Sequence, residues 1–139
     1  MSPNKALVQR FYDEVAGQGN IDLIDELVDE NMIEHDEFPG LEPNREGVKA
    51  LFRSVRAGFP DVRFEALQYV EEGDLVCAMV RITGTQQGEF MGMPASGKKI
   101  DVIAFDLLRI RDGRAVEHWG VTDAMKMMQQ LGAVPGPPA

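Results

Sequence analysis

The spacing of apolar residues changes at one point in the chain, the tripeptide Phe-Pro-Asp at residues 59–61. Before this point, apolar residues such as Val48 and Leu51 recur every three or four positions, which is the period of one face of an α-helix. After it, Val62 and Phe64 lie two positions apart, which is the period of a β-strand. A chain that forms helices first and strands afterwards belongs to the α+β class.

This spacing, with the residues that begin or end each element, places the helices and strands. We expect helices over residues 3–16, 21–30 and 45–57, a short helix at 123–132, and strands from residue 62 and over 75–82, 100–110 and 115–121. Asn20 is expected to cap the second helix. Residues 39–43, with two prolines and a glycine, are expected to form a loop.

The expected architecture is three N-terminal helices packed on a curved antiparallel sheet, followed by a short C-terminal helix. Such a sheet and its helices enclose a conical cavity, and pockets of that kind hold small apolar molecules. The 139 residues are a common length for one domain, so we expect residues 1–132 to form a single domain and 133–139 a flexible C-terminal tail.

The charge and cysteine content bear on partners and compartment. The chain has 14 Lys and Arg against 23 Asp and Glu, a formal net charge of −9, which opposes binding to nucleic acid or to an anionic membrane. No stretch resembles a signal peptide or approaches the ~20 apolar residues of a membrane helix. The single Cys77 cannot form an internal disulfide. We therefore expect a cytoplasmic protein without nucleic-acid or membrane partners.

Motifs for metals and cofactors are absent from the sequence. The two histidines lie far apart and form no HxH or HExxH spacing, so we expect no metal. The fragment Gly-Gln-Gly at residues 17–19 follows a helix, whereas a dinucleotide loop follows a strand. No serine has the surroundings of a nucleophile elbow. We expect no organic cofactor either.

The segment VEHWGVTDAMKMMQQLG, residues 116–132, holds the first candidates for chemistry. Strand alternation places His118 on one face and Trp119 on the other, so His118 can orient a base or relay a proton. Asp123 has two interpretations. In an apolar pocket its pKa would rise and it could act as a general base; as the N-cap of the last helix it would accept backbone N–H groups instead.

A second group of candidates lies near the first two helices. His35 and Asp36 follow the second helix, where such a fold opens its cavity, and they can contact substrate or act as a further acid/base pair; alternatively, they belong to a solvated loop. Tyr12 lies on the first helix. We also assign aromatic residues to the wall of an apolar substrate pocket, namely Phe52, Phe90, Phe105 and Trp119.

Several segments together resemble the SnoaL-like polyketide cyclase, or ester cyclase, family of the NTF2-like superfamily. They are NMIEHD (31–36), GFPDVRFEAL (58–67), EEGDLVCAMVRITGTQQGEFMGMPASGKKI (71–100) and RIRDGRAVEHWGVTDAMKMMQQLG (109–132). The likeness runs from the first helix to Gly132 and implies the NTF2-like cone fold, which agrees with the expected order of elements.

The resemblance also implies an activity. In the family, an acidic residue matching Asp123 is the general acid/base of an intramolecular aldol ring closure on a polyketide methyl ester, without metal or organic cofactor. It further implies that His118 and His35 polarise or position the substrate. The substrate would be a small apolar molecule with a carbonyl group, and the protein a homodimer or higher homo-oligomer.

Two alternatives stay open. The surroundings of Tyr12 and Asp36, FYDEVAGQGN and MIEHD, also resemble the steroid Δ-isomerases of the same fold, in which a carboxylate base works with a Tyr-containing oxyanion site. Asp101 would then be the neutral acid partner. The other alternative is a noncatalytic module whose cone only binds a small ligand.

Overall fold

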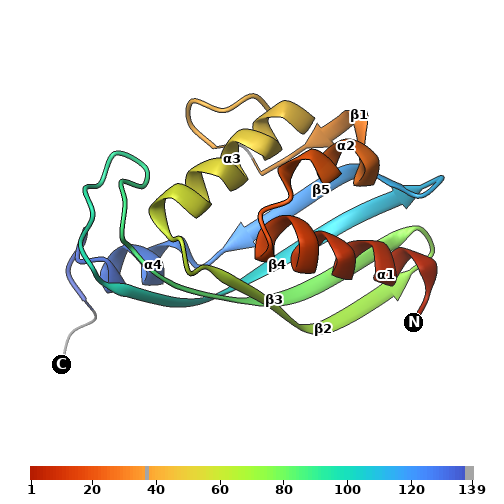
Figure 1. The fold of residues 1–139 in the computed structure, drawn as a ribbon. Coiled ribbons are helices and arrows are strands. Elements are labelled where there is room, and N and C mark those ends of the chain that lie inside the picture. Colours follow the sequence, from red (N-terminus) through yellow and green to blue (C-terminus); the bar gives the residue numbers. More distant parts are fainter. Residues whose placement is uncertain (37, 137–139) are drawn as a thin grey trace.

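The structure, a computed structural model, describes residues 1–36 and 38–136, and its strands form one curved sheet (Figure 1). The strands are β1 (Val28–Glu34), β2 (Arg63–Glu72), β3 (Leu75–Thr85), β4 (Lys99–Arg111) and β5 (Arg114–Thr122). They lie in the order β1-β5-β4-β3-β2, with β2 to β5 antiparallel and β1 parallel to β5. The expected α+β class is confirmed, and the four expected strands correspond to β2 to β5.

The helices begin and end close to the expected positions. They are α1 (Pro3–Arg10), continued by a π-helical segment η1 (Phe11–Gly17), a 3-10 turn η2 (Ile21–Leu23), α2 (Ile24–Leu27), α3 (Arg45–Gly58) and α4 (Ala124–Gln130). Ser2 caps α1, because its hydroxyl oxygen accepts the N–H of Lys5 at 3.1 Å. Asn44 caps α3 in the same way, since its Oδ1 accepts the N–H of Gly47 at 3.0 Å.

The expectation for residues 21–30 is wrong at its C-terminal end. The helix stops at Leu27, because Val28 already has extended backbone angles, and the next residues form β1. The apolar residues fit a helical stripe, but β1 finds a hydrogen-bonding partner in β5 that the local pattern does not show. Asn20 makes no side-chain cap. The sheet is therefore mixed, where we expected it to be wholly antiparallel.

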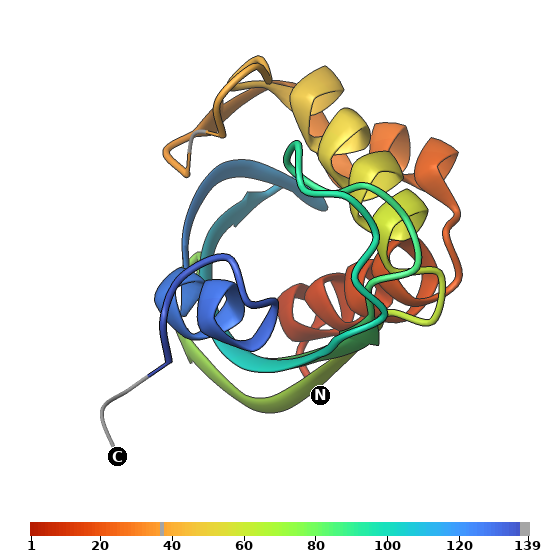
Figure 2. The ribbon, with the colours of Figure 1, turned by 90° about the vertical axis from the view of Figure 1, so that its left-hand side faces the viewer.

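The helices cover the concave side of the sheet, as the end-on view in Figure 2 shows. One buried cluster lies between α1 and the inner face of the sheet and includes Val8, Val76 and Val102, each at most 1% exposed. A second cluster joins α2 to β1 through residues such as Ile24 and Met32. The burial of these apolar groups provides most of the driving force for folding, and it fixes β1 beside β5.

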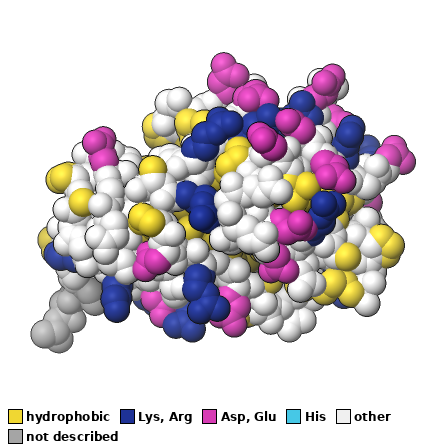
Figure 3. All heavy atoms as spheres, in the orientation of Figure 1, with side chains coloured by type: hydrophobic (Ala, Val, Ile, Leu, Met, Phe, Trp, Pro, Cys, Tyr) yellow, Lys and Arg dark blue, Asp and Glu magenta, His cyan; other side chains and the backbone are white. Residues whose placement is uncertain are grey.

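Acidic and basic side chains are interspersed over the face of the molecule seen in Figure 3. Within the described residues, no helix has both the length and the apolar character that a membrane crossing requires. The expected tail at residues 133–139 extends past residue 136, so its last three residues lie outside the described part of the chain.

Gly47, the third residue of α3, provides a test of the packing. A Cβ at Gly47 would overlap the backbone carbonyl oxygen of Glu42. Alanine favours a helix over glycine by up to ~1 kcal/mol, but overpacking of this kind costs about 1–3 kcal/mol. We predict that Gly47→Ala lowers the free energy of unfolding, measured by urea denaturation. Gly136→Ala, with no atom within 4 Å of the added Cβ, is the control and should change nothing.

Candidate active site

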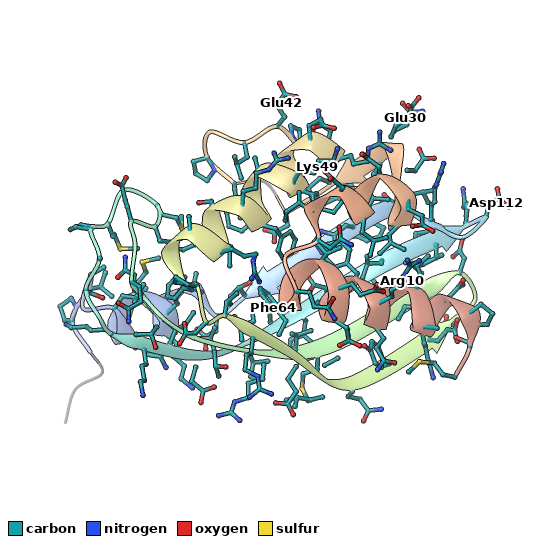
Figure 4. All side chains as sticks on the ribbon, viewed as in Figure 1. Arg10, Glu30, Glu42, Lys49, Phe64 and Asp112 are labelled. Atoms are coloured by element: carbon teal, nitrogen blue, oxygen red, sulfur yellow. The ribbon has the colours of Figure 1, made fainter. Side chains whose placement is uncertain are left out.

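A pocket lies between the inner face of the sheet and the helices. Its empty volume is about 980 Å³, including the part open to solvent. Most of the lining is apolar, and Figure 4 shows Phe64 pointing from β2 toward the helices. The aromatic and aliphatic lining includes Phe11, Leu51, Phe52, Phe64, Ile82 and Leu108. Such a wall fits a flat apolar molecule and weakens the hydration of any charged group within it.

His118 is at the centre of the polar part of the pocket. Its Nδ1 lies 2.6 Å from Oε1 of Glu34, and its Nε2 lies 2.8 Å from Oδ1 of Asp106. Burial by itself would lower the pKa of His118, but the hydrogen bonds to Asp106 and Glu34 outweigh burial and raise that pKa to about 10. At neutral pH the ring is therefore an imidazolium that donates a hydrogen bond from each nitrogen to a carboxylate.

Tyr12 extends this network. Its hydroxyl group donates to Oδ2 of Asp106 at 2.5 Å, so both oxygens of Asp106 are used, one by Tyr12 and the other by His118. Burial and the neighbouring Asp106 carboxylate raise the pKa of Tyr12 well above its usual value. The phenol therefore stays protonated and acts as a donor. A continuous chain runs from Glu34 through His118 and Asp106 to Tyr12.

The strand pairing explains why these residues meet. Glu34 is the register partner of His118 in the parallel β1–β5 pair, and the N–H of His35 donates to the carbonyl oxygen of His118 at 2.9 Å. Asp106 lies on β4, opposite Gly120 of β5. Side chains two positions apart on a strand share a face, so His118 and residue 120 both point to the pocket side. Tyr12 lies on η1, which packs on the pocket-facing side of the sheet.

Asp36 is the other carboxylate on the pocket wall. Burial raises its pKa; the charges of Glu34 and Asp106 act in the same direction, and that of His118 opposes them. Its backbone N–H donates to Oε1 of Glu34 at 2.9 Å. Among residues 1–36 and 38–136 no side-chain hydrogen bond to the Asp36 carboxylate is found. Asp36 is thus half-buried, and neither of its carboxylate oxygens has a donor among these residues, whereas Oε1 of Glu34 and both oxygens of Asp106 have one.

Four of the residues selected from the sequence do lie on the pocket, namely Tyr12, Asp36, Phe52 and His118. His118 faces the pocket and Trp119 does not, as the alternation predicts, but the pairing of β4 and β5 shifts register between Arg109 and Ile110, and Ala115 therefore lines the pocket as well. No bulge interrupts the pairing of β4 and β5 around residue 120.

Asp123 does not lie on the pocket. It is exposed and caps α4, with its Oδ1 accepting the N–H of Lys126 at 3.2 Å. Thr122, the preceding residue, lines the pocket, so strand alternation directs Asp123 away from it. Of the two interpretations open from the sequence, the structure places Asp123 in the capping position, and it lacks the apolar surroundings that a base in the pocket requires.

His35 and Trp119 lie on the opposite face of the sheet from His118. Their rings stack with centroids 4.7 Å apart and planes 8° apart, and Nε2 of His35 lies 2.7 Å from Oε2 of Glu117. Phe105 is 50% exposed on that outer face. Phe90 is buried, but it packs against Phe59 in the core. None of these four residues lines the pocket, because each side chain lies in another environment.

Asp101, the acid partner in the isomerase alternative, is exposed on β4. Its carboxylate accepts two hydrogen bonds from the guanidinium of Arg81, at 2.6 and 2.9 Å, and these hold the pKa of Asp101 below its usual value. A carboxyl group with a lowered pKa is ionised at neutral pH and cannot be a neutral acid there. Of the residues in the isomerase alternative, Tyr12 and Asp36 line the pocket, whereas Asp101 does not.

Glu34 and Asp106 are site residues that the sequence analysis missed. Asp106 had a visible signal, because it is a charged residue at an inward-facing position of the apolar stretch VIAFDLLRI. Glu34 had none, since β1 itself was not recognised. In the described part of the chain, no group of three or more His, Cys, Asp or Glu residues is arranged to hold a metal ion.

Comparisons with known proteins agree with this architecture. The family model described as SnoaL-like polyketide cyclase matches residues 6–131. Aklanonic acid methyl ester cyclase DauD of Streptomyces sp. (strain C5) is 28% identical over 141 residues, covering 95% of this chain and 83% of DauD. The structure of TsrD from Streptomyces laurentii superposes with a TM-score of 0.86 at 27% identity, covering 95% of this chain and 96% of TsrD. The structure of wild-type IdmH from Streptomyces antibioticus superposes with a TM-score of 0.80 at 31% identity, covering 93% of this chain and 98% of IdmH.

The His118 network predicts a pH dependence of stability. The pKa of His118 is raised in the folded protein from 6.5 to about 10, so its contribution to stability is complete below pH 6.5 and is lost as the pH rises to about 10. One proton gives a slope of at most about 1.4 kcal/mol per pH unit. We predict that the difference in unfolding free energy between the wild type and His118→Gln shrinks across this range in urea titrations.

The second histidine provides a matched control for this measurement. His35→Gln removes the exposed histidine that pairs with Glu117, and because ion pairs at exposed positions contribute little to stability, the difference in unfolding free energy between wild type and this variant should be small. A constant difference for His118→Gln would contradict the assignment of His118 as a bound imidazolium.

Proposed function

The chain belongs to the SnoaL-like polyketide cyclase family, and from this premise we propose that it is a cofactor-free acid/base enzyme that closes a ring on a polyketide-like carbonyl substrate. We further propose that Asp36 is the general base. Ring closure of this kind joins two carbons of one molecule, which requires an apolar pocket, a base near the carbon that loses a proton, and a polar frame that fixes the base.

The position of Asp36 carries the proposal. A carboxylate that removes a proton from carbon works best when its pKa lies nearer to neutrality, and burial in an apolar wall gives Asp36 a raised pKa. The carboxylates of Glu34 and Asp106 are occupied by hydrogen bonds to His118 and Tyr12. Asp36 is the carboxylate of this group in which neither oxygen accepts a hydrogen bond from another described residue, whereas Oε1 of Glu34 and both oxygens of Asp106 do.

The reaction can be balanced with Asp36 alone as the group that moves a proton. The carboxylate takes a proton from the carbon next to a substrate carbonyl, which leaves an enolate. The enolate carbon attacks a second carbonyl carbon in the same molecule, a carbon–carbon bond forms, and the carbonyl oxygen becomes an alkoxide. Protonated Asp36 then gives its proton to the alkoxide, which becomes a hydroxyl group, and the carboxylate is restored.

His118 and Tyr12 serve as fixed groups in this proposal. Both nitrogens of His118 donate to carboxylates, so the ring holds Glu34 and Asp106 in place and its positive charge limits the rise in the pKa of Asp36. Thr122 also lines the pocket and has a hydroxyl group that can donate to a substrate carbonyl. A preorganised polar frame of this kind costs no rearrangement when the charge on the substrate changes.

The charge of the site favours an uncharged substrate. Three carboxylates, of Glu34, Asp36 and Asp106, surround one imidazolium, that of His118, on the pocket wall. A substrate with a free carboxylate would add a further negative charge to this apolar pocket. An ester group would not, and DauD is a cyclase of a methyl ester. We therefore propose that the carbonyl substrate enters as an ester.

A second reaction shares the first step. Because Tyr12 and Asp36 line the same pocket, proton removal by Asp36 followed by return of the proton to another carbon would give an isomerase instead of a cyclase. The hydroxyl of Tyr12 already donates to Asp106, so it is not free to donate to an enolate without exchanging partners. This favours ring closure, and the product distinguishes the two reactions.

We predict that Asp36→Asn lowers kcat for cyclisation of aklanonic acid methyl ester by at least ~10²-fold, the usual effect of removing a general base. The amide has nearly the same shape but does not accept the proton. The measurement is product formation followed by liquid chromatography, with binding of the substrate measured separately. Asp123→Asn is the control and should retain activity, since Asp123 is exposed and caps α4.

The opposite pattern of activities would contradict the proposal. If Asp123→Asn loses activity and Asp36→Asn does not, the base is Asp123 and the proton leaves the substrate outside this pocket. If the wild type binds the ester but turns over neither it nor related carbonyl compounds, the protein is a binding module.

We also predict that the methyl ester has a kcat/KM at least ~10-fold above that of the corresponding free acid at pH 8, because the added carboxylate is repelled by the three in the pocket. The two compounds differ in one methyl group, so their apolar contacts are almost the same. Competition experiments in which the free acid inhibits ester turnover measure its binding directly. Equal kcat/KM values would show that the carboxylates do not select the substrate.

A further inference from the structure

Gly120 lies in the interior of β5, where a glycine weakens a strand because it has no side chain to pack. Its backbone does not explain its presence, since Gly120 is not one of the glycines with a positive φ angle. Its pairing with Asp106 of β4 is also regular, so no bulge requires a glycine. The remaining explanation is the space that a side chain would occupy.

That space is already filled by the groups of the site. A Cβ at residue 120 would lie 2.8 Å from Oδ1 of Asp106, 2.9 Å from Oδ2 of Asp36 and 2.9 Å from Cε1 of His118. Distances below 3.0 Å are essentially never found for real Cβ atoms. Three side chains from three segments of the chain thus converge on the position of one missing side chain.

We infer that Gly120 is a positioning residue: the absence of a side chain at this point of β5 allows the carboxylate of Asp36 to lie against the pair formed by His118 and Asp106. A Cβ would push at least one of the three aside. Asp106 and His118 are each held by two hydrogen bonds, whereas no such bond to the Asp36 carboxylate is found among the described residues. Asp36 is therefore the group that would move.

The surroundings of Asp36 decide what this movement would do. The titratable groups around it are Glu34 on β1, Asp106 on β4, His118 on β5 and Glu42 in the loop before α3. Helix α3 contributes apolar Val48 and Leu51 to the same wall. Burial is the largest cause of the raised pKa of Asp36. Displacement toward solvent reduces that burial, so the pKa should fall toward its ordinary value.

The first test needs no substrate. Carboxyl ¹³C NMR titration gives the pKa of Asp36, with its signal assigned by the spectrum of Asp36→Asn. We expect the pKa of Asp36 to be lower in Gly120→Ala than in the wild type, while the far-UV circular dichroism spectrum stays the same. Val121→Ala is the matched control, because Val121 is the next residue, is 72% exposed and does not line the pocket. An unchanged pKa of Asp36 in a folded Gly120→Ala protein would overturn the inference.

The second test uses the proposed reaction, on which this part of the inference rests. With aklanonic acid methyl ester, Gly120→Ala should lower kcat about 10-fold or more with a smaller change in KM, and the acidic limb of the kcat profile should move to lower pH. In the Asp36→Asn background, Gly120→Ala should have no further effect on kcat, because the group it positions is already inactive. If Gly120→Ala lowers kcat by the same factor in the Asp36→Asn background as in the wild type, the inference is overturned. If the wild type turns over no carbonyl compound but the pKa of Asp36 still moves, the proposed function fails and the positioning role stands.

A third measurement covers the case in which Gly120→Ala does not fold. The double variant Gly120→Ala/Asp36→Ala removes the carboxylate that the added Cβ would meet. We expect this variant to fold, with a melting temperature near that of Asp36→Ala. If the double variant is also unfolded, the added Cβ clashes with Asp106 and His118 and not with Asp36. That result would overturn the inference that Gly120 positions Asp36.

Discussion

The polar side of the pocket depends on the two hydrogen bonds that the imidazolium of His118 donates to the carboxylates of Glu34 and Asp106. Carboxylates are rarely buried unless they are paired, because removing a charge from water is costly. Glu34 and Asp106 are brought into the pocket by two different strands, and the ring of His118 donates a hydrogen bond to each. Through the bond from Tyr12 to Asp106 the same network reaches the helical layer. One residue therefore joins β1, β4, β5 and the helices at the point where the candidate chemistry lies.

The two histidines show how burial changes the role of one side-chain type. His35 and His118 both contact glutamates, but they lie on opposite faces of the sheet. The His35 side chain is 40% exposed, and ion pairs in such positions contribute little to stability. The His118 side chain is 20% exposed and is surrounded by the apolar wall. The inner histidine therefore shapes the electrostatics of a pocket, whereas the outer one pairs with Glu117 and stacks on Trp119.

The sequence predicted some strands and site residues correctly and missed others. The pattern of apolar and turn residues predicted β2 to β5, through an alternation with a period of two for β2 and through apolar stretches between turns for the later strands. It missed β1, since residues 28–34 alternate poorly and are held by their parallel pairing with β5. Of the site, the alternation placed His118 correctly, and Asp36 was selected as a contact. For Asp123 the local sequence allows both an N-cap and a general base, and the family resemblance led to its prediction as the base, whereas in the structure it caps α4.

The sequence by itself determined the fold class, the position of most helices and strands, and the family resemblance, because these follow from local spacing and from motifs that are continuous along the chain. Only the tertiary structure decided which carboxylates meet. Glu34 ends β1 and Asp36 follows it by two residues, whereas Asp106 lies on β4, and their positions around His118 depend on the register of β1 and β4 against β5. The same holds for Gly120, whose missing side chain has a consequence only because three other residues fill its space. A one-residue change of register would turn each of these groups to the other face of the sheet.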